Sequence, residues 1–171
     1  MTKYTVLPLD AAVLKELRGV DDAGRLCAPY IATPDDEGSP LRCCLRPIAV
    51  GERIALVSYA PLRRWAAAAG VDPGAYDEQG PVFIHADECG GFSPGGTYPV
   101  ARSGALRTVR RYDARGRIAG GRLLEIPEDV VAGFDAAFDD AFSDPDVVLV
   151  HVRALEYGCF HFEVRRPSAE G

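Results

Sequence analysis

The clearest periodic pattern of apolar residues lies in the last third of the chain. Four apolar side chains recur every four residues, which places them along one face of an α-helix. They are Val130, Phe134, Phe138 and Phe142. Pro127 and two acidic residues precede this stripe, and both features favour the start of a helix. The pattern predicts a helix from about Glu128 to Phe142 with its stripe packed against a sheet.

Two shorter helices have favourable residues at their ends. Asp10 is suited to cap a helix over 11–18, and Gly19 suits the left-handed position that terminates a helix. A second short helix is expected over 62–69, because a proline precedes it and Gly70 follows it.

Alternation of apolar and polar residues predicts the strands. We expect a short opening strand over 3–8 and a buried strand over 81–85. The segments 41–45 and 53–59 are expected to pair as a hairpin. A further hairpin is expected over 105–126, around an Asp-Ala-Arg-Gly turn.

The segments 147–155 and 159–165 are expected to form the closing hairpin. A three-residue loop that ends in glycine fixes its register, because a shift of one residue would turn every side chain to the other face. This register pairs Leu155 with Cys159, His151 with Glu163, and Arg153 with His161. Val150, Phe160 and Phe162 then share an apolar face, and the polar residues occupy the other face.

These elements predict an α+β fold: one domain over 1–171, mostly an antiparallel sheet of hairpins, with two or three helices packed on it. The segments 20–40 and 86–101 are rich in Gly, Pro and Asp and are expected to be loops.

Composition narrows the functional classes. The formal net charge is −6, which argues against a general nucleic-acid binder. The apolar runs are far too short to span a membrane, and the N-terminus lacks the apolar core of a signal peptide. We therefore expect a cytoplasmic protein in which the five cysteines are reduced thiols.

Charge is unevenly distributed along the chain. The segment 102–122 has seven arginines and one acid, whereas 125–146 has eight acids and no base. We expect the two segments either to offset each other where the helix packs on the hairpin or to face water, although the basic segment is also suited to bind a phosphate or carboxylate.

His85 and Cys89 are the strongest local signal for a metal site, because both are zinc-ligand types and lie where a strand meets a glycine-rich loop. Four-coordinate zinc would need further ligands from elsewhere in the chain, such as Cys43, Cys44, His151, Cys159 or His161. The alternative is a histidine bonded to the backbone and a small buried thiol. Cys43 and Cys44 are adjacent, so in a strand their sulfurs would point to opposite faces. This disfavours joint redox chemistry.

The closing hairpin is a second candidate site. Its polar face carries two of the three histidines, and a histidine opposite Glu163 is placed to act as a general base. The alternative is a solvated face with cross-strand charge pairs.

The chain resembles a bacterial family known as domain of unknown function 1203. The resemblance is carried by Arg42-Cys-Cys-Leu45, Gly51-Glu52, Ser58-Tyr59, Gly80-Pro-Val-Phe-Ile-His85 with Cys89, Arg111-Tyr-Asp113, Val150-His-Val-Arg153 and Gly158-Cys159-Phe160. In the family the first motif often reads Cys-Arg-x-Cys-Leu, and Leu41 stands at its first position here, so Cys44 is the thiol that carries over. The resemblance implies one shared polar site at His85, Cys89, Arg111, Asp113, His151 and Arg153.

Two functions remain open from the sequence. The first is binding of a small anionic ligand, with or without a catalytic step, in one pocket lined by His85, Arg111, His151 and Arg153. The alternative is a structural or interaction module supported by zinc through Cys44, His85 and Cys89. The sequence indicates neither a reaction, nor a partner, nor an oligomeric state.

Overall fold

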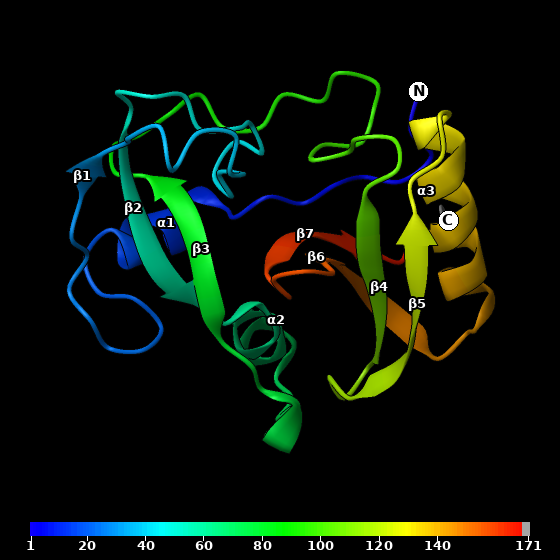
Figure 1. Ribbon diagram of the computed structural model, residues 1–171. Coiled ribbons are helices and arrows are strands. Elements are labelled where there is room, and N and C mark those ends of the chain that lie inside the picture. Colours follow the sequence, from blue (N-terminus) through cyan, green and yellow to red (C-terminus); the bar gives the residue numbers. More distant parts are fainter. Residues whose placement is uncertain (169–171) are drawn as a thin grey trace.

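The structure is a computed structural model, and it describes residues 1–168. Its strands form two antiparallel sheets (Figure 1). The three-stranded sheet has the order β1-β2-β3, with β1 at Tyr30–Ile31, β2 at Arg53–Tyr59 and β3 at Gly80–His85. The four-stranded sheet has the order β5-β4-β6-β7, with β4 at Leu106–Asp113, β5 at Ile118–Glu125, β6 at Val147–Ala154 and β7 at Phe160–Arg165.

The helices agree with the sequence pattern, and the α+β class is confirmed. They are α1 (Ala11–Leu17), α2 (Pro61–Ala69) and α3 (Val130–Ser143), with a 3-10 turn η1 at Gly74–Tyr76. Asp10 caps α1 by accepting a hydrogen bond from the Val13 backbone amide at 2.8 Å. Gly70 ends α2 in the left-handed conformation. The expectation for Gly19 is wrong, because α1 already ends at Arg18 in the right-handed conformation.

Helix α3 covers the outer face of the four-stranded sheet (Figure 1). Phe134 and Phe138 are fully buried there against Val150, Val152 and Phe162, so the predicted stripe forms the centre of the larger core. Charges meet across the same contact, since Arg111 and Arg122 both pair with the Asp140 carboxylate. The basic and acidic segments therefore offset each other at this contact, whereas Arg110 and Arg117 pair with acids outside the acidic segment.

Two predicted strands do not form. The segment 3–8 makes only an isolated bridge, in which Leu7 pairs with Glu163 of β7. The segment 41–45 is a tight turn, closed by the Leu45 amide donating to the Leu41 carbonyl at 2.9 Å. Strand β2 pairs instead with β3 and with β1, a two-residue strand inside the segment expected to be a loop.

The closing hairpin has the predicted strands and part of the predicted register. His151 pairs with Glu163, but a bulge follows and Arg153 then pairs with Phe160. The expected pairs Arg153–His161 and Leu155–Cys159 are therefore wrong, because His161 is an extra residue in β7. The bulge turns Phe160 away from α3, and its ring lies 5.0 Å from that of His151.

The two sheets face each other at an angle, and α2 lies between them (Figure 1). Leu62 of α2 packs against Tyr112 and Leu149 of the four-stranded sheet, on the face opposite α3. Helix α1 packs through Leu14 and Leu17 on the three-stranded sheet. Within residues 1–168, no helix has the length and apolar character needed to cross a bilayer.

Candidate metal centre

The turn at 41–45 brings two thiols to the end of β3. Leu41 forms a parallel bridge with Phe83, and the Arg42 amide donates to the Phe83 carbonyl at 2.8 Å. The chain then reverses through Leu45, which has a φ of 57°. In this turn Cys43 and Cys44 do not diverge as they would in a strand, and their Sγ atoms lie 4.0 Å apart.

His85, the last residue of β3, directs its Nδ1 atom toward both sulfurs. Nδ1 lies 3.4 Å from the Cys43 Sγ and 3.8 Å from the Cys44 Sγ. Cys89 adds a third sulfur from the glycine-rich loop that follows β3. We call Cys43, Cys44, His85 and Cys89 the thiol–imidazole cluster; its four ligand-type atoms all lie within 4.8 Å of one another.

The separations among the Cys43, Cys44 and His85 ligand atoms are close to those of a tetrahedral zinc site. Zinc binds sulfur at about 2.3 Å and imidazole nitrogen at about 2.0 Å, so neighbouring ligand atoms around a tetrahedral ion lie about 3.6 to 3.8 Å apart. The two sulfur–nitrogen distances and the sulfur–sulfur distance given above are within a few tenths of an ångström of that range. Cys43 and Cys44 are buried, and Cys89 is partly exposed.

Glu52, directly before β2, orients the imidazole from behind. Its Oε1 atom lies 3.2 Å from the His85 Nε2, and its Oε2 atom accepts a hydrogen bond from the Ala49 amide at 2.9 Å. The hydrogen bond from the Ala49 backbone amide lowers the pKa of the Glu52 carboxyl, and the contact with His85 lowers it further. A carboxylate that holds the outer nitrogen of a histidine fixes which nitrogen faces a metal, here Nδ1.

Hydrogen bonds inside the cluster distinguish its two buried thiols. The Cys43 thiol donates to the Cys44 sulfur, which lowers the pKa of Cys44 and raises the pKa of Cys43. The Cys43 sulfur in turn accepts from the His85 backbone amide at 3.3 Å. All five cysteines of the chain are free thiols.

A family model matches residues 38–166 and is described as protein of unknown function (DUF1203). The chain belongs to this family. No curated protein and no solved structure matches it. The part of the chain that matches the family contains Glu52 and the whole thiol–imidazole cluster.

Three of these family residues are those that the sequence suggested for zinc. The structure brings Cys44, His85 and Cys89 together as that hypothesis requires. It adds Cys43, which the zinc set expected from the sequence did not include, because only Cys44 carries over from the family motif. The prolines at 40 and 47, which flank the segment on both sides, are the signal that could have indicated a turn.

The four residues suggested for one anion pocket lie apart. His85 belongs to the three-stranded sheet, and the other three belong to the four-stranded sheet. Arg111 faces α3, where it pairs with Asp140, whereas His151 lies on the opposite face against Tyr112. The structure therefore does not support one cavity lined by all four.

The remaining polar residues of the family pattern already have local partners. Asp113 holds the β4–β5 turn by accepting from the Arg115 and Arg117 amides at 2.9 and 3.0 Å. Arg153 donates to the Gly158 carbonyl at 2.9 Å and lies 3.5 Å from the Glu78 carboxylate. These contacts explain the two side chains without a ligand.

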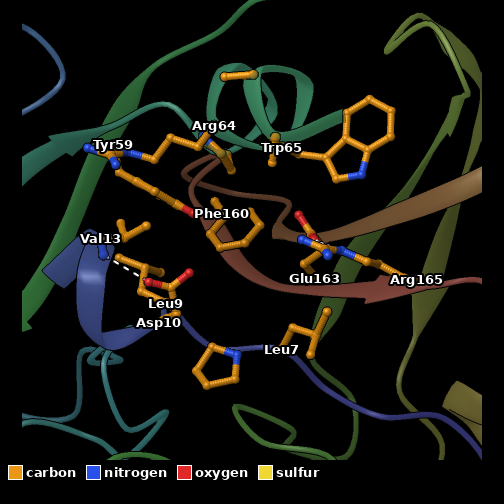
Figure 2. A pocket seen from close by; sticks show the side chains of 14 residues that line it. Leu7, Leu9, Asp10, Val13, Tyr59, Arg64, Trp65, Phe160, Glu163 and Arg165 are labelled. Carbon is orange, nitrogen blue, oxygen red and sulfur yellow. Dashed lines mark hydrogen bonds and ion pairs between the residues drawn. The ribbon is translucent and has the colours of Figure 1, made fainter. Parts of the chain in front are cut away.

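His151 is fully buried behind a cavity of about 290 Å³. Figure 2 shows Glu163 and Arg165 on one wall of this cavity and Arg64 on another. His151 does not line it; its Nε2 lies 3.0 Å from the Glu163 Oε2, and burial lowers its pKa. Three of the four charged side chains that line this cavity form ion pairs, because Glu163 also accepts from Arg165 and Arg64 binds Asp22. These ion pairs give no reason to expect a charged ligand in this cavity.

Proposed function

We propose that the protein binds one zinc ion at the thiol–imidazole cluster and that this ion stabilises the fold around it. The observation that carries the proposal is the convergence of three sulfurs and one imidazole nitrogen within 4.8 Å. Three cysteines and one histidine are an established ligand set of structural zinc sites.

The composition of the cluster favours a structural rather than a catalytic ion. Four protein ligands fill the tetrahedral positions of zinc, so no position remains for water or substrate. The ligands come from the turn at 41–45, the end of β3 and the loop after β3. A bound ion would hold these three segments together, and the loop depends on it most, since it has no regular secondary structure over 86–101.

The surroundings suit the charge of such a centre. Zinc with three thiolates and one neutral imidazole carries a net negative charge. Arginines lie beside the cluster: Arg18 donates to the His85 carbonyl at 3.1 Å, and Arg46 lies 3.7 Å from the Glu52 carboxylate. Binding also requires reduced thiols, which agrees with the cytoplasmic location expected from the sequence.

Metal analysis of the purified protein, expressed without a metal-binding tag, tests the proposal. We expect about one zinc ion per chain, as the four-ligand site implies. The Cys44→Ser variant should lose most of this zinc, whereas Cys27→Ser should retain it, because Cys27 is partly buried like Cys89 but lies outside the cluster. Equal zinc content in the two variants, or no zinc binding by the parent protein, would refute the proposed site.

Glu52→Gln tests the orientation of His85. The amide keeps the size of the side chain but no longer accepts as a carboxylate, so we expect zinc affinity to fall about 10- to 100-fold. Competition with a chromogenic chelator measures this change. Glu88→Gln is the control, because this exposed acid lies next to Cys89 in sequence but makes no ion pair within residues 1–168. An unchanged affinity in Glu52→Gln would mean that Glu52 does not position the ligand.

A further inference from the structure

A second cavity, of about 590 Å³, lies between the two sheets and is distinct from the metal centre. Its walls come from the turn at 41–45, from β2 and β3 on one side, and from β4, β6 and β7 on the other. Three basic side chains line it: Arg42, Arg107 and His161. We call it the arginine cavity. Its volume lies in the range of small-molecule sites, which is about 300 to 1,000 Å³.

Arg42 and Arg107 are both buried, and neither has a carboxylate partner in the part of the chain that the structure describes. Arg42 is 3% exposed and Arg107 is 8% exposed, yet no acid within residues 1–168 forms an ion pair with either. Arg42 donates to the carbonyls of Phe160 and Pro40, and Arg107 donates to those of Leu106 and Val100. A buried charge is normally paired with an opposite charge. Two guanidinium groups without such a partner in one cavity therefore favour binding of an anion.

Two buried nitrogen atoms at this cavity have no hydrogen-bond partner among residues 1–168: the Arg107 Nε and the His161 Nδ1. His161 is 4% exposed, and the bulge in β7 brings it into the cavity wall. Burial and the charges of Arg42 and Arg107 lower the pKa of His161 to about 3, so its ring is neutral at pH 7. A neutral imidazole can still donate one N–H bond to a ligand.

The acids near the cavity do not replace a ligand. Glu37 and Glu156 line it, but both are exposed to solvent. Water screens exposed charges strongly, whereas charges in the protein interior are screened much less. The interior of the cavity is therefore positive, although the whole chain has a net charge of −6.

Apolar side chains form another part of the wall, and two of them are largely exposed to solvent. Leu56 is 51% exposed and Tyr157 is 81% exposed, and both line the cavity together with Phe83. The Val100 backbone, which receives a hydrogen bond from Arg107, has a φ of 54°, a conformation rare for a β-branched residue. Strained backbone of this kind is concentrated at ligand sites.

We propose that the arginine cavity binds a small organic oxyanion, a carboxylate or phosphate group attached to an apolar body. The anionic group binds Arg42, Arg107 and His161, and the apolar body covers Leu56, Phe83 and Tyr157. This site differs from the four-residue pocket suggested by the sequence, and it does not depend on the proposed zinc ion.

Titration calorimetry with the purified full-length protein tests the site. The probes are phenylacetate, phenyl phosphate, inorganic phosphate and the neutral 2-phenylethanol. We expect saturable binding of at least one organic anion, much weaker binding of inorganic phosphate, and none of the alcohol. Comparison of phenylacetate with phenyl phosphate identifies the preferred group. Equal binding of alcohol and anions, or no saturable binding of either organic anion, would overturn the proposal.

Two variants locate the binding. Arg107→Gln removes one buried charge and should weaken anion binding about 10- to 100-fold. Arg122→Gln is the matched control, because Arg122 lies in the same basic segment but faces α3 and should leave binding unchanged. Chemical shifts of the parent protein give a test that needs no variant: anion titration should move the amide signals of Cys159 and His161. Shifts confined to other regions, or equal affinity in a folded Arg107→Gln protein and Arg122→Gln, would refute this location.

Discussion

The two halves of the molecule are held together by different means. In the half that contains α3, apolar rings at a spacing of four residues pack on the four-stranded sheet, and the core has no polar centre. In the half that contains α1 and the three-stranded sheet, the corresponding core includes Cys43 and Cys44 and borders His85. In one half apolar packing forms the core and ion pairs lie at its edge, and in the other the packing surrounds a polar cluster.

This difference implies different responses to mutation and to metal. Packing in the α3 half depends on side-chain volume, so it should not respond to metal. The cluster places three thiols and an imidazole among apolar neighbours, and buried polar groups contribute little unless they find partners. We therefore expect the α3 half to be sensitive to cavities and the cluster half to be sensitive to zinc.

The largest effect is expected from Phe138→Ala. The side chain is fully buried at the centre of the α3 core, and its truncation should lower the free energy of unfolding by about 3 to 5 kcal/mol. The loss should be the same with zinc and with a chelator. Leu123→Ala is the control, because Leu123 is 56% exposed on β5 and should cost less than about 1 kcal/mol. Urea unfolding measures both, and similar losses would contradict the predicted burial of the stripe.

Zinc binding should cause the next largest change in the free energy of unfolding. A metal that binds only the folded protein stabilises it by about 2.7 kcal/mol at a free concentration 100 times its Kd. The stability of the parent protein should rise accordingly when zinc replaces the chelator, whereas Cys44→Ser should show no such rise. A zinc effect of equal size in both proteins would place the ion outside the cluster.

The pH dependence of stability should show a contribution from His161. Its pKa is about 3 in the folded protein and close to 6.5 in the unfolded chain, because burial and the charges of Arg42, Arg107 and Arg153 disfavour the protonated ring. Below pH 6.5 the unfolded chain takes up a proton that the folded protein does not, so stability falls by about 1.4 kcal/mol for each pH unit. From pH 6.5 to pH 5 this amounts to about 2 kcal/mol.

Urea unfolding at several pH values compares the parent protein with His161→Gln. The difference between the two isolates His161 from the other groups that titrate in this range, including the ligands of the cluster. We expect the variant to lose about 2 kcal/mol less than the parent between pH 6.5 and pH 5. Parallel curves for the two proteins would mean that His161 is protonated in the folded state.

The parts of the fold that the sequence predicted are those with a periodic pattern. The stripe of α3, the helix α2 with its terminal Gly70, and the β4–β5 hairpin follow directly from the spacing of apolar residues and from the residues at their ends. These signals are local, so no knowledge of the tertiary structure is needed to interpret them.

The parts that the sequence did not predict depend on single turns or on distant partners. The short apolar segment 41–45 satisfies a strand pattern, but it forms a turn, and its expected partner β2 pairs instead with β1 and β3. The bulge at His161 changes which face of the sheet the residues before it occupy. An alternating pattern of apolar and polar residues does not indicate where such a bulge occurs. For the same reason three of the four cluster residues were identified, whereas the set Arg42, Arg107 and His161 was not. Those three residues meet only through long-range packing.

The smallest effect is expected from the cap of α1. Asp10→Ala removes the hydrogen bond that the Val13 amide donates to the Asp10 carboxylate, and it should lower the free energy of unfolding by about 1 kcal/mol. Helix α1 leads directly into Arg18, which donates to the His85 and Asp87 carbonyls, so the loss belongs to the cluster half. Amide hydrogen exchange should therefore become faster in α1 and in the loop after β3, with little change in α3. Asp129→Ala is the matched variant, because it removes the hydrogen bond that the Ala132 amide donates to Asp129 at the start of α3. It should make amide exchange faster in α3, with little change in α1. Equal acceleration of both helices by either variant would show that the two halves open as one unit, and the distinction between them would then be one of composition rather than of stability.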